Sequence, residues 1–171
     1  GYQSDTSPSR STKVERLDFS NDTGTTLKGP LASARHEAGG GIGNANYGYS
    51  VGGQITGNPS DPPTVSTVER IDFANDTATA APKGPLSQSR YGLGGTGDQS
   101  YGYCAGGAEP GTSVVDRIDF ANDTATAAVK GPLTATIYAV AGTGARMNAN
   151  GTTGKPARKR FSDGATEVTA G

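Results

Sequence analysis

The side chains best suited to chemistry in this sequence are arginines and aspartates that recur in copies. Three stretches begin at Arg16, Arg70 and Arg117, and each reads Arg-(Leu/Ile)-Asp-Phe-(Ser/Ala)-Asn-Asp-Thr. Arg70 and Asp72 are two positions apart, so on a strand both side chains point to the same face. Stacked copies would join them in an interior ladder of charge-assisted hydrogen bonds, whereas an anion site would need the ladder to open onto a channel. The repeated charged residues are Arg16, Asp18, Arg70, Asp72, Arg117 and Asp119.

Tyrosines at alternate positions form a second candidate set. The sequence Tyr-Gly-Tyr occurs twice, at residues 47–49 and 101–103. Aromatic rings can stack on sugar faces and anchor protein interfaces, but alternating tyrosines on a strand also serve as core residues. Both interpretations stay open at this point. The candidate recognition surface consists of Tyr47, Tyr49, Tyr101 and Tyr103.

Histidine and cysteine are too scarce for a catalytic or metal centre. His36 and Cys104 are the only residues of their types. Nucleophilic catalysis needs a nucleophile, a base and an orienting group together, and no copy departs from the pattern to supply them. A metal site of several His and Cys ligands is excluded by the counts. We therefore expect no enzymatic activity, no metal and no cofactor.

The Asn-Asp-Thr triplets allow three interpretations. Asn and Asp favour tight turns, because they tolerate left-handed backbone and bond to their own main chain. The same triplets match the N-glycosylation pattern of secreted proteins, and clustered oxygens could bind calcium. A turn is sufficient to explain them. The triplets begin at Asn21, Asn75 and Asn122.

Composition favours a thin, turn-rich array over one large core. Of 171 residues only 32% are hydrophobic, none is Trp and 27 are Gly. Such a chain suits stacked sheets that bury their faces against one another. The net charge of −1 gives no reason to expect nucleic-acid binding, although Lys155-Pro-Ala-Arg-Lys-Arg160 is a local basic cluster that could contact an acidic partner. No apolar run is long enough for membrane insertion, and a start at Gly1 without a visible signal peptide suggests a processed or partial chain.

The elements that position these residues are short extended segments. Alternation of side chains and turn residues predicts four strands per copy, with a turn at 74–76 and a break at Lys83-Gly84-Pro85-Leu86. In the second copy the strands are expected at residues 68–73, 77–81, 90–96 and 101–107.

A spacing of roughly 50 residues between copies indicates a repeat protein. We expect about three and a half units, with the last one degenerate. The predicted division is 1–13 for the end of a preceding unit and a linker, 14–67, 68–114 and 115–155 for three repeats, and 156–171 for a partial repeat or tail. In the last segment Arg158-Lys-Arg-Phe161-Ser-Asp163 aligns loosely with the start of the third repeat if one residue is dropped.

A four-stranded unit with a closing diglycine and an Asp-containing hairpin after it resembles the Kelch repeat. The diglycines are Gly52-Gly53 and Gly106-Gly107, and the hairpins span 72–77 and 119–124. Arg35 and Arg90 stand where Kelch units often carry Arg. Kelch units usually carry a Trp near the end of the hairpin, which is missing here, so the packing between units must differ.

The resemblance implies an all-β fold of four-stranded blades in a β-propeller or blade array. Three and a half blades are too few to close a ring, so a dimer completing seven blades and a piece of a larger array are both considered. The amino-acid sequence of the repeats also resembles that of long Kelch-like structural proteins of marine tailed phages.

That second resemblance implies an extracellular or virion protein, such as a tail fibre or surface decoration. It would adhere to itself, to other virion proteins or to a host-surface glycan, through loops such as 53–63 and 108–112. The alternatives are a lectin-like carbohydrate-binding propeller and a Kelch scaffold that recruits a protein partner.

Overall fold

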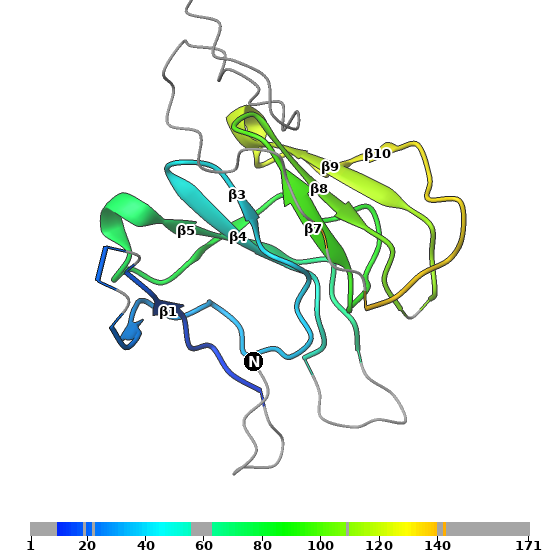
Figure 1. The fold of residues 1–171 in the computed structure, drawn as a ribbon. Coiled ribbons are helices and arrows are strands. Elements are labelled where there is room, and N and C mark those ends of the chain that lie inside the picture. Colours follow the sequence, from blue (N-terminus) through cyan, green and yellow to red (C-terminus); the bar gives the residue numbers. More distant parts are fainter. Residues whose placement is uncertain are drawn as a thin grey trace, which may run out of the picture.

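The computed structural model describes residues 10–18, 20–21, 23–55, 63–108, 110–139 and 142. Within these residues the chain forms ten strands in three antiparallel sheets, with two single-turn 3-10 helices. The predicted all-β class is therefore confirmed, and Figure 1 shows the sheets.

One sheet has two strands and two sheets have four. The two-stranded sheet pairs β1 (Glu15–Arg16) with β2 (Thr26–Leu27). The second sheet has the order β3-β4-β5-β6 and the third the order β10-β9-β8-β7. Their bounds are β3 Ile42–Gly43, β4 Tyr47–Val51, β5 Val68–Asp72, β6 Ala81–Lys83, β7 Gly94–Gly97, β8 Tyr101–Ala105, β9 Val115–Asp119 and β10 Ala128–Lys130.

Each four-stranded sheet is built from two successive repeats. Strand β4 belongs to the first repeat, but it pairs over its whole length with β5 of the second, from Tyr47 opposite Asp72 to Val51 opposite Val68. β8 of the second repeat pairs with β9 of the third in the same register. Each four-stranded sheet therefore combines the second half of one sequence repeat with the first half of the next.

The predicted second strand at 77–81 is wrong in its position. The chain turns at Asp76–Ala78, and the amide of Ala80 donates at 2.9 Å to the carbonyl of Pro30, which follows β2, instead of extending its own sheet. The strand forms later, as β6, and includes Pro82. Pro82 is tolerated because β6 lies at an edge, where one row of N–H groups has no ladder partner.

The predicted turn after the Arg-Ile-Asp-Phe strand is a 3-10 helix. Helix η1 covers Phe73–Asn75 and η2 covers Phe120–Asn122. The Asp72 and Asp119 carboxylates accept hydrogen bonds from the amides of Ala74 and Ala121. These aspartates are thus N-caps, which leave their arginine neighbours to other partners.

The backbone conformation at the two diglycines explains why glycine occupies these positions. Gly52, Gly53, Gly106 and Gly107 have φ values of 60, 106, 66 and 115°, a region that favours glycine. The turn lets the amide of Gly53 donate to the carbonyl of Arg90 at 3.0 Å, which ties the end of β4 to the next repeat.

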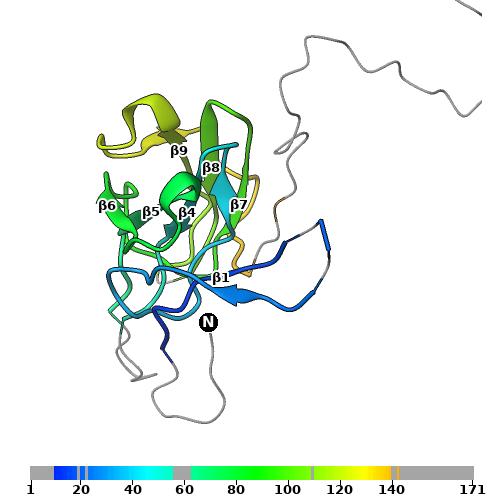
Figure 2. The ribbon, with the colours of Figure 1, turned by 90° about the vertical axis from the view of Figure 1, so that its left-hand side faces the viewer.

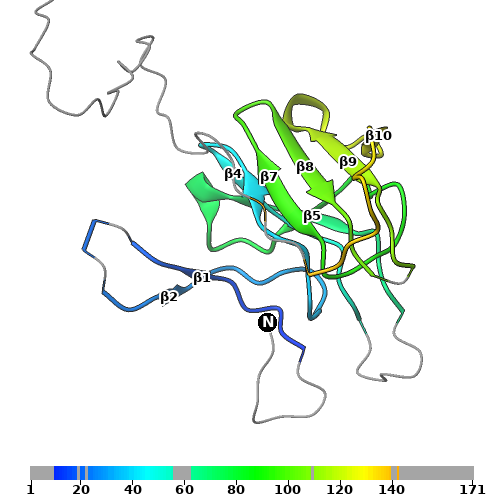
Figure 3. The same ribbon diagram turned by 45° about the vertical axis from the view of Figure 1, so that its right-hand side comes forward.

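The core lies between the two four-stranded sheets. Val51, Val68, Leu86 and Leu93 are among its buried members, and an added Cβ at Gly102 would overlap Ile42 and Phe120. Figure 2 shows the outer hairpins following one another from blue through green to yellow, and Figure 3 shows the β1–β2 sheet extending away from the other two. The two-stranded sheet therefore covers less of its neighbour than the four-stranded sheets cover of each other.

Candidate functional site

Three donors from the second sheet converge on Asp123 in the turn after η2. The Arg70 Nη1 atom lies 2.9 Å from Asp123 Oδ2, and the Lys83 Nζ atom lies 3.1 Å from Oδ1. The Tyr49 hydroxyl donates to Oδ2 at 2.9 Å, and its ring stacks on Phe120 with centroids 5.0 Å apart. We call Tyr49, Arg70, Lys83 and Asp123 the Asp123 cluster. It joins the second sheet to the third.

The Asp123 cluster has a simpler counterpart one repeat earlier. Asp76 accepts from Arg16 at 2.6 Å and from Lys28 at 3.1 Å. The backbone contacts beside the two aspartates also match, with Gly29 donating to the Asp76 carbonyl and Gly84 to the Asp123 carbonyl, both at 2.8 Å. The charged ladder is thus a contact between successive sheets.

The expected ladder between stacked copies uses a different aspartate from the predicted Asp72 and Asp119. Asp72 is held by its own 3-10 helix, and Arg70 reaches across to Asp123 in the next repeat. Arg70 and Asp72 lie on the same face of one strand, so their side chains project in parallel. The Arg70 guanidinium therefore meets a carboxylate on the opposing sheet more directly than it could meet that of Asp72. The observed ion pairs join successive sheets.

A second pair of cross-links is fully buried. Arg90 Nη2 lies 2.9 Å from Asp116 Oδ2, and both side chains have no exposed surface. Arg35 forms the equivalent pair with Glu69, and it also donates to the carbonyls of Gly52 and Thr67. The acidic members were not singled out from the sequence. Their signal was an acid directly before each repeated arginine of the strand.

The four predicted recognition tyrosines do not form one surface. Tyr49 is only 3% exposed and is a core residue. Tyr47 and Tyr101 lie beneath guanidinium groups, with Arg70 4.2 Å and Arg117 4.3 Å from the ring centroids. Tyr103 is half-buried on β8, opposite Arg117. Of the four, Tyr101 lines a hollow.

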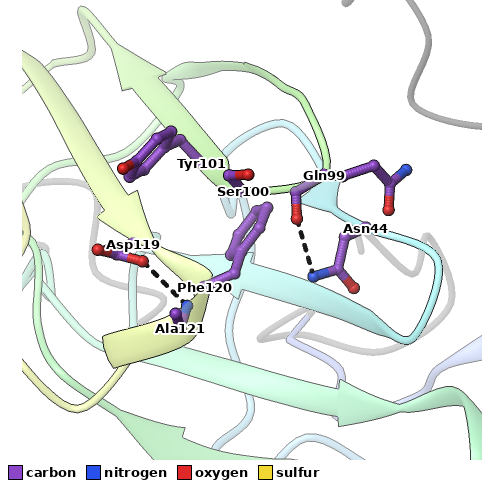
Figure 4. Close-up of a pocket in the computed structure, with 7 residues that line it drawn as sticks. All are labelled: Asn44, Gln99, Ser100, Tyr101, Asp119, Phe120 and Ala121. Atoms are coloured by element: carbon purple, nitrogen blue, oxygen red, sulfur yellow. Dashed lines mark hydrogen bonds between the residues drawn. The ribbon is translucent and has the colours of Figure 1, made fainter.

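That hollow lies where the turn between β3 and β4 meets the start of β8 and the end of β9. Its volume is about 420 Å³, and it is open to solvent on one side. Asn44 Nδ2 donates to the Gln99 carbonyl at 3.5 Å, and the Ala45 amide donates to Gln99 Oε1 at 3.1 Å. Figure 4 shows Asn44 and Gln99 on one side of the hollow, and Tyr101 and Asp119 on the other. The lining residues are Asn44, Gln99, Ser100, Tyr101, Asp119, Phe120 and Ala121.

The hollow offers the groups that bind neutral polar ligands. It combines amide and hydroxyl groups with the edge of an aromatic ring, a pattern suited to hydroxyl-bearing compounds. One oxygen of the Asp119 carboxylate accepts the hydrogen bond that caps η2. The arrangement can bind, but it contains no histidine, lysine or cysteine to act on a substrate.

The single thiol is poorly placed for chemistry. Cys104 has no exposed surface, and burial raises its pKa to about 12, so the nucleophilic thiolate is scarce at neutral pH. Burial and the bond to Asp123 also raise the pKa of Tyr49 above its ordinary value. His36 forms a bridge with Gln54 through its backbone.

Metal and membrane features are lacking in the part of the chain that the structure describes. There, no three His, Cys, Asp or Glu side chains gather as a metal site would require. The carboxylates of Asp76 and Asp123 are already taken by cationic groups, which argues against calcium at those turns. No described helix is long and apolar enough to span a bilayer.

Several predicted features lie outside the described residues. These are the basic cluster at 155–160, the segment 156–171, and parts of the loops 53–63 and 108–112. No model of a known protein family matches the sequence, and no curated protein is significantly similar to it.

Proposed function

We propose that this chain is a non-enzymatic structural and adhesive repeat module, which uses its stacked sheets as a stiff support for a contact surface. The observation that carries the proposal is the repetition of the same charged cross-links between successive sheets. Arg16 and Lys28 hold Asp76 as Arg70 and Lys83 hold Asp123. The strongest polar groups of the repeat thus serve assembly and are not left for catalysis.

The contact surface that we propose is the hollow beside η2. Tyr101 and Phe120 supply aromatic surface, and Asn44, Gln99 and Ser100 supply donors and acceptors. A glycan of a cell surface presents hydroxyl groups and apolar ring faces that complement this lining. Assignment to a virion appendage, such as a tail fibre, is supported only by the resemblance of the repeats to Kelch-like phage structural proteins, as is the arrangement of the sheets as propeller blades.

The experiment is binding of the purified chain to a panel of immobilised glycans. Tyr101→Ala should abolish binding, since it removes the exposed aromatic wall of the hollow. Tyr47→Ala is the matched control, because Tyr47 occupies the equivalent position beneath Arg70 but does not line the hollow. Equal loss in both variants would point to destabilisation. Binding that survives Tyr101→Ala would place the contact surface elsewhere.

A protein scaffold is the alternative that the same variants test. If no glycan binds while the chain captures a defined virion protein through Tyr101, the module is an assembly component and not a lectin. Turnover of any substrate by the pure chain would refute its non-enzymatic character.

A further inference from the structure

The outer face of the third sheet carries a second set of donors that matches the Asp123 cluster. Tyr103, Arg117 and Lys130 are the equivalents of Tyr49, Arg70 and Lys83 one repeat later. The strand register confirms the match, because Tyr103 lies opposite Arg117 as Tyr49 lies opposite Arg70. Within the described residues, neither Arg117 nor Lys130 has an ion pair, and Arg117 Nε is buried without a hydrogen-bond acceptor.

The surroundings of these donors also lack the cover that their equivalents have. Leu86 is 2% exposed beneath the third sheet, whereas Leu133 is half-buried. An added Cβ at Gly84 would overlap the Ala125 carbonyl, whereas the same atom at Gly131 meets open space. Val129 is 58% and Ile137 43% exposed on the same repeat. The face is thus built for a further repeat that the described residues do not supply.

We propose that the C-terminal segment 156–171 of the same chain covers this face, with Asp163 as the carboxylate held by Tyr103, Arg117 and Lys130. Two residues of Arg158-Lys-Arg-Phe161-Ser-Asp163 support the assignment. Phe161 aligns with Phe120, which stacks on Tyr49, and Asp163 aligns with Asp123 with one residue fewer between them. The segment retains the two residue types that contact the tyrosine of the cluster.

The loss of both charged residues of the buried cross-link distinguishes this segment from a second copy of the chain. At the buried cross-link, the position of Arg35 and Arg90 is Ile137 in the third repeat, and the position of Glu69 and Asp116 is Ala157 in the last segment. Both charges are absent together, so Ile137 would face an apolar partner. The first repeat of a second copy would instead bring Glu15 against Ile137 and bury a carboxylate without its arginine, which is strongly unfavourable.

The test is a double-mutant cycle on the full chain between Lys130→Gln and Asp163→Asn, with thermal unfolding as the readout. Glu167→Gln is the charge-matched control, because it removes one negative charge from the same segment without altering Asp163. We expect Asp163→Asn to lower the unfolding midpoint by roughly 2 to 4 °C and Glu167→Gln to leave it unchanged. The double variant should be no less stable than Lys130→Gln alone. The same cycle on Lys83 and Asp123 gives the reference coupling.

Amide hydrogen exchange and native mass complete the test. Residues 158–168 should exchange slowly in the wild type and rapidly in Lys130→Gln, while the chain stays a monomer. Equal behaviour of Asp163→Asn and Glu167→Gln, or fast exchange of this segment in the wild type, would overturn the proposal. A dimer that dissociates in Lys130→Gln would also overturn it, since a second copy would then be the occupant.

Discussion

Asp76 and Asp123 stand at the same position of successive repeats and accept the same arginine and lysine from the sheet before them, but their surroundings differ. The Arg16 and Asp76 side chains are 54% and 15% exposed, whereas Arg70 and Asp123 are 24% and 7% exposed. The sheet that holds Asp123 includes Tyr49 on β4, which bonds the carboxylate and stacks on Phe120. The two-stranded sheet before Asp76 has no such strand among the described residues.

The difference shows that the inner strands, and not the charged residues, decide how deeply the contact is buried. Identical ion pairs are weak in solvent and stronger where a neighbouring ring excludes water. The equivalent phenylalanines of the two contacts differ in burial in the same direction: Phe73 is 50% exposed and Phe120 is 8% exposed. The same repeat sequence therefore gives a surface contact at one end and a buried network in the middle.

The buried pairs are the feature that both contacts share, and they should show the largest effect. Arg35→Met and Arg90→Met should each cost about 3 to 5 kcal/mol in the free energy of unfolding, because each leaves a buried carboxylate without its cation. Urea unfolding measures this loss. We expect the two variants to lose similar free energy of unfolding. A much smaller loss in one of them would show that its contact is peripheral.

The double variant Arg90→Met/Asp116→Leu is the control for this prediction. It removes both charges, so it should regain most of the lost stability. Arg90 Nε and Asp116 Oδ1 have no hydrogen-bond partner among the described residues, which makes the pair expensive to bury. A double variant as unstable as Arg90→Met would mean that side-chain shape, and not charge, holds the sheets together.

The two phenylalanines should separate the contacts sharply. Phe120→Ala removes the ring stacked on Tyr49 and should cost about 3 kcal/mol or more, whereas Phe73→Ala should cost about 0.5 kcal/mol or less. The unfolding midpoints of both variants in urea provide the comparison. Similar losses would show that Phe73 is covered in solution by a surface that the described residues do not include.

The aspartates should show the same order with a smaller difference. Asp123→Asn weakens three charge-assisted bonds and should cost about 1.5 to 3 kcal/mol, and Asp76→Asn about 0 to 1 kcal/mol. Raising the salt concentration should reduce the stability difference between wild type and Asp76→Asn more than that for Asp123→Asn, because exposed charges are screened more. A reversed order would contradict the role assigned to Tyr49.

The alkaline pH dependence should be the most gradual effect. Burial raises the pKa of Cys104 to about 12, so the folded state keeps a proton that the unfolded state begins to release near pH 9. Its contribution is fully present below that pH, and stability falls as the pH rises further, by up to about 1.4 kcal/mol per pH unit.

Cys104→Ser copies the residue that the first repeat carries at this position, Ser50. Thermal unfolding at several pH values between 8 and 11 should show a shallower decline for this variant. Tyr49→Phe should also flatten the decline, but only above the ordinary tyrosine range. An unchanged slope in Cys104→Ser would mean that the thiol already ionises in the folded protein.

Features that depend on local chemistry could be predicted from the residues alone. Alternating side chains and turn residues predicted an all-β chain with strands at 68–73 and 101–107, which form over Val68–Asp72 and Tyr101–Ala105. The resemblance to Kelch repeats pointed to Gly52-Gly53 and Gly106-Gly107, which adopt positive φ values. These features follow from backbone geometry within a few residues, which one copy of the repeat already encodes. The strand at 77–81 was misplaced because Ala80 bonds to Pro30 in another repeat.

Which charges meet and which rings are buried depends on how the sheets pack in three dimensions. Arg70 and Asp72 are neighbours in the sequence, but the guanidinium reaches Asp123 in the next sheet. Tyr47 and Tyr49 differ by two positions on one strand, and only Tyr49 lies within reach of Phe120. Partner choice depends on how neighbouring sheets stack, and a motif that recurs almost unchanged in successive repeats does not specify which neighbouring repeat supplies the partner.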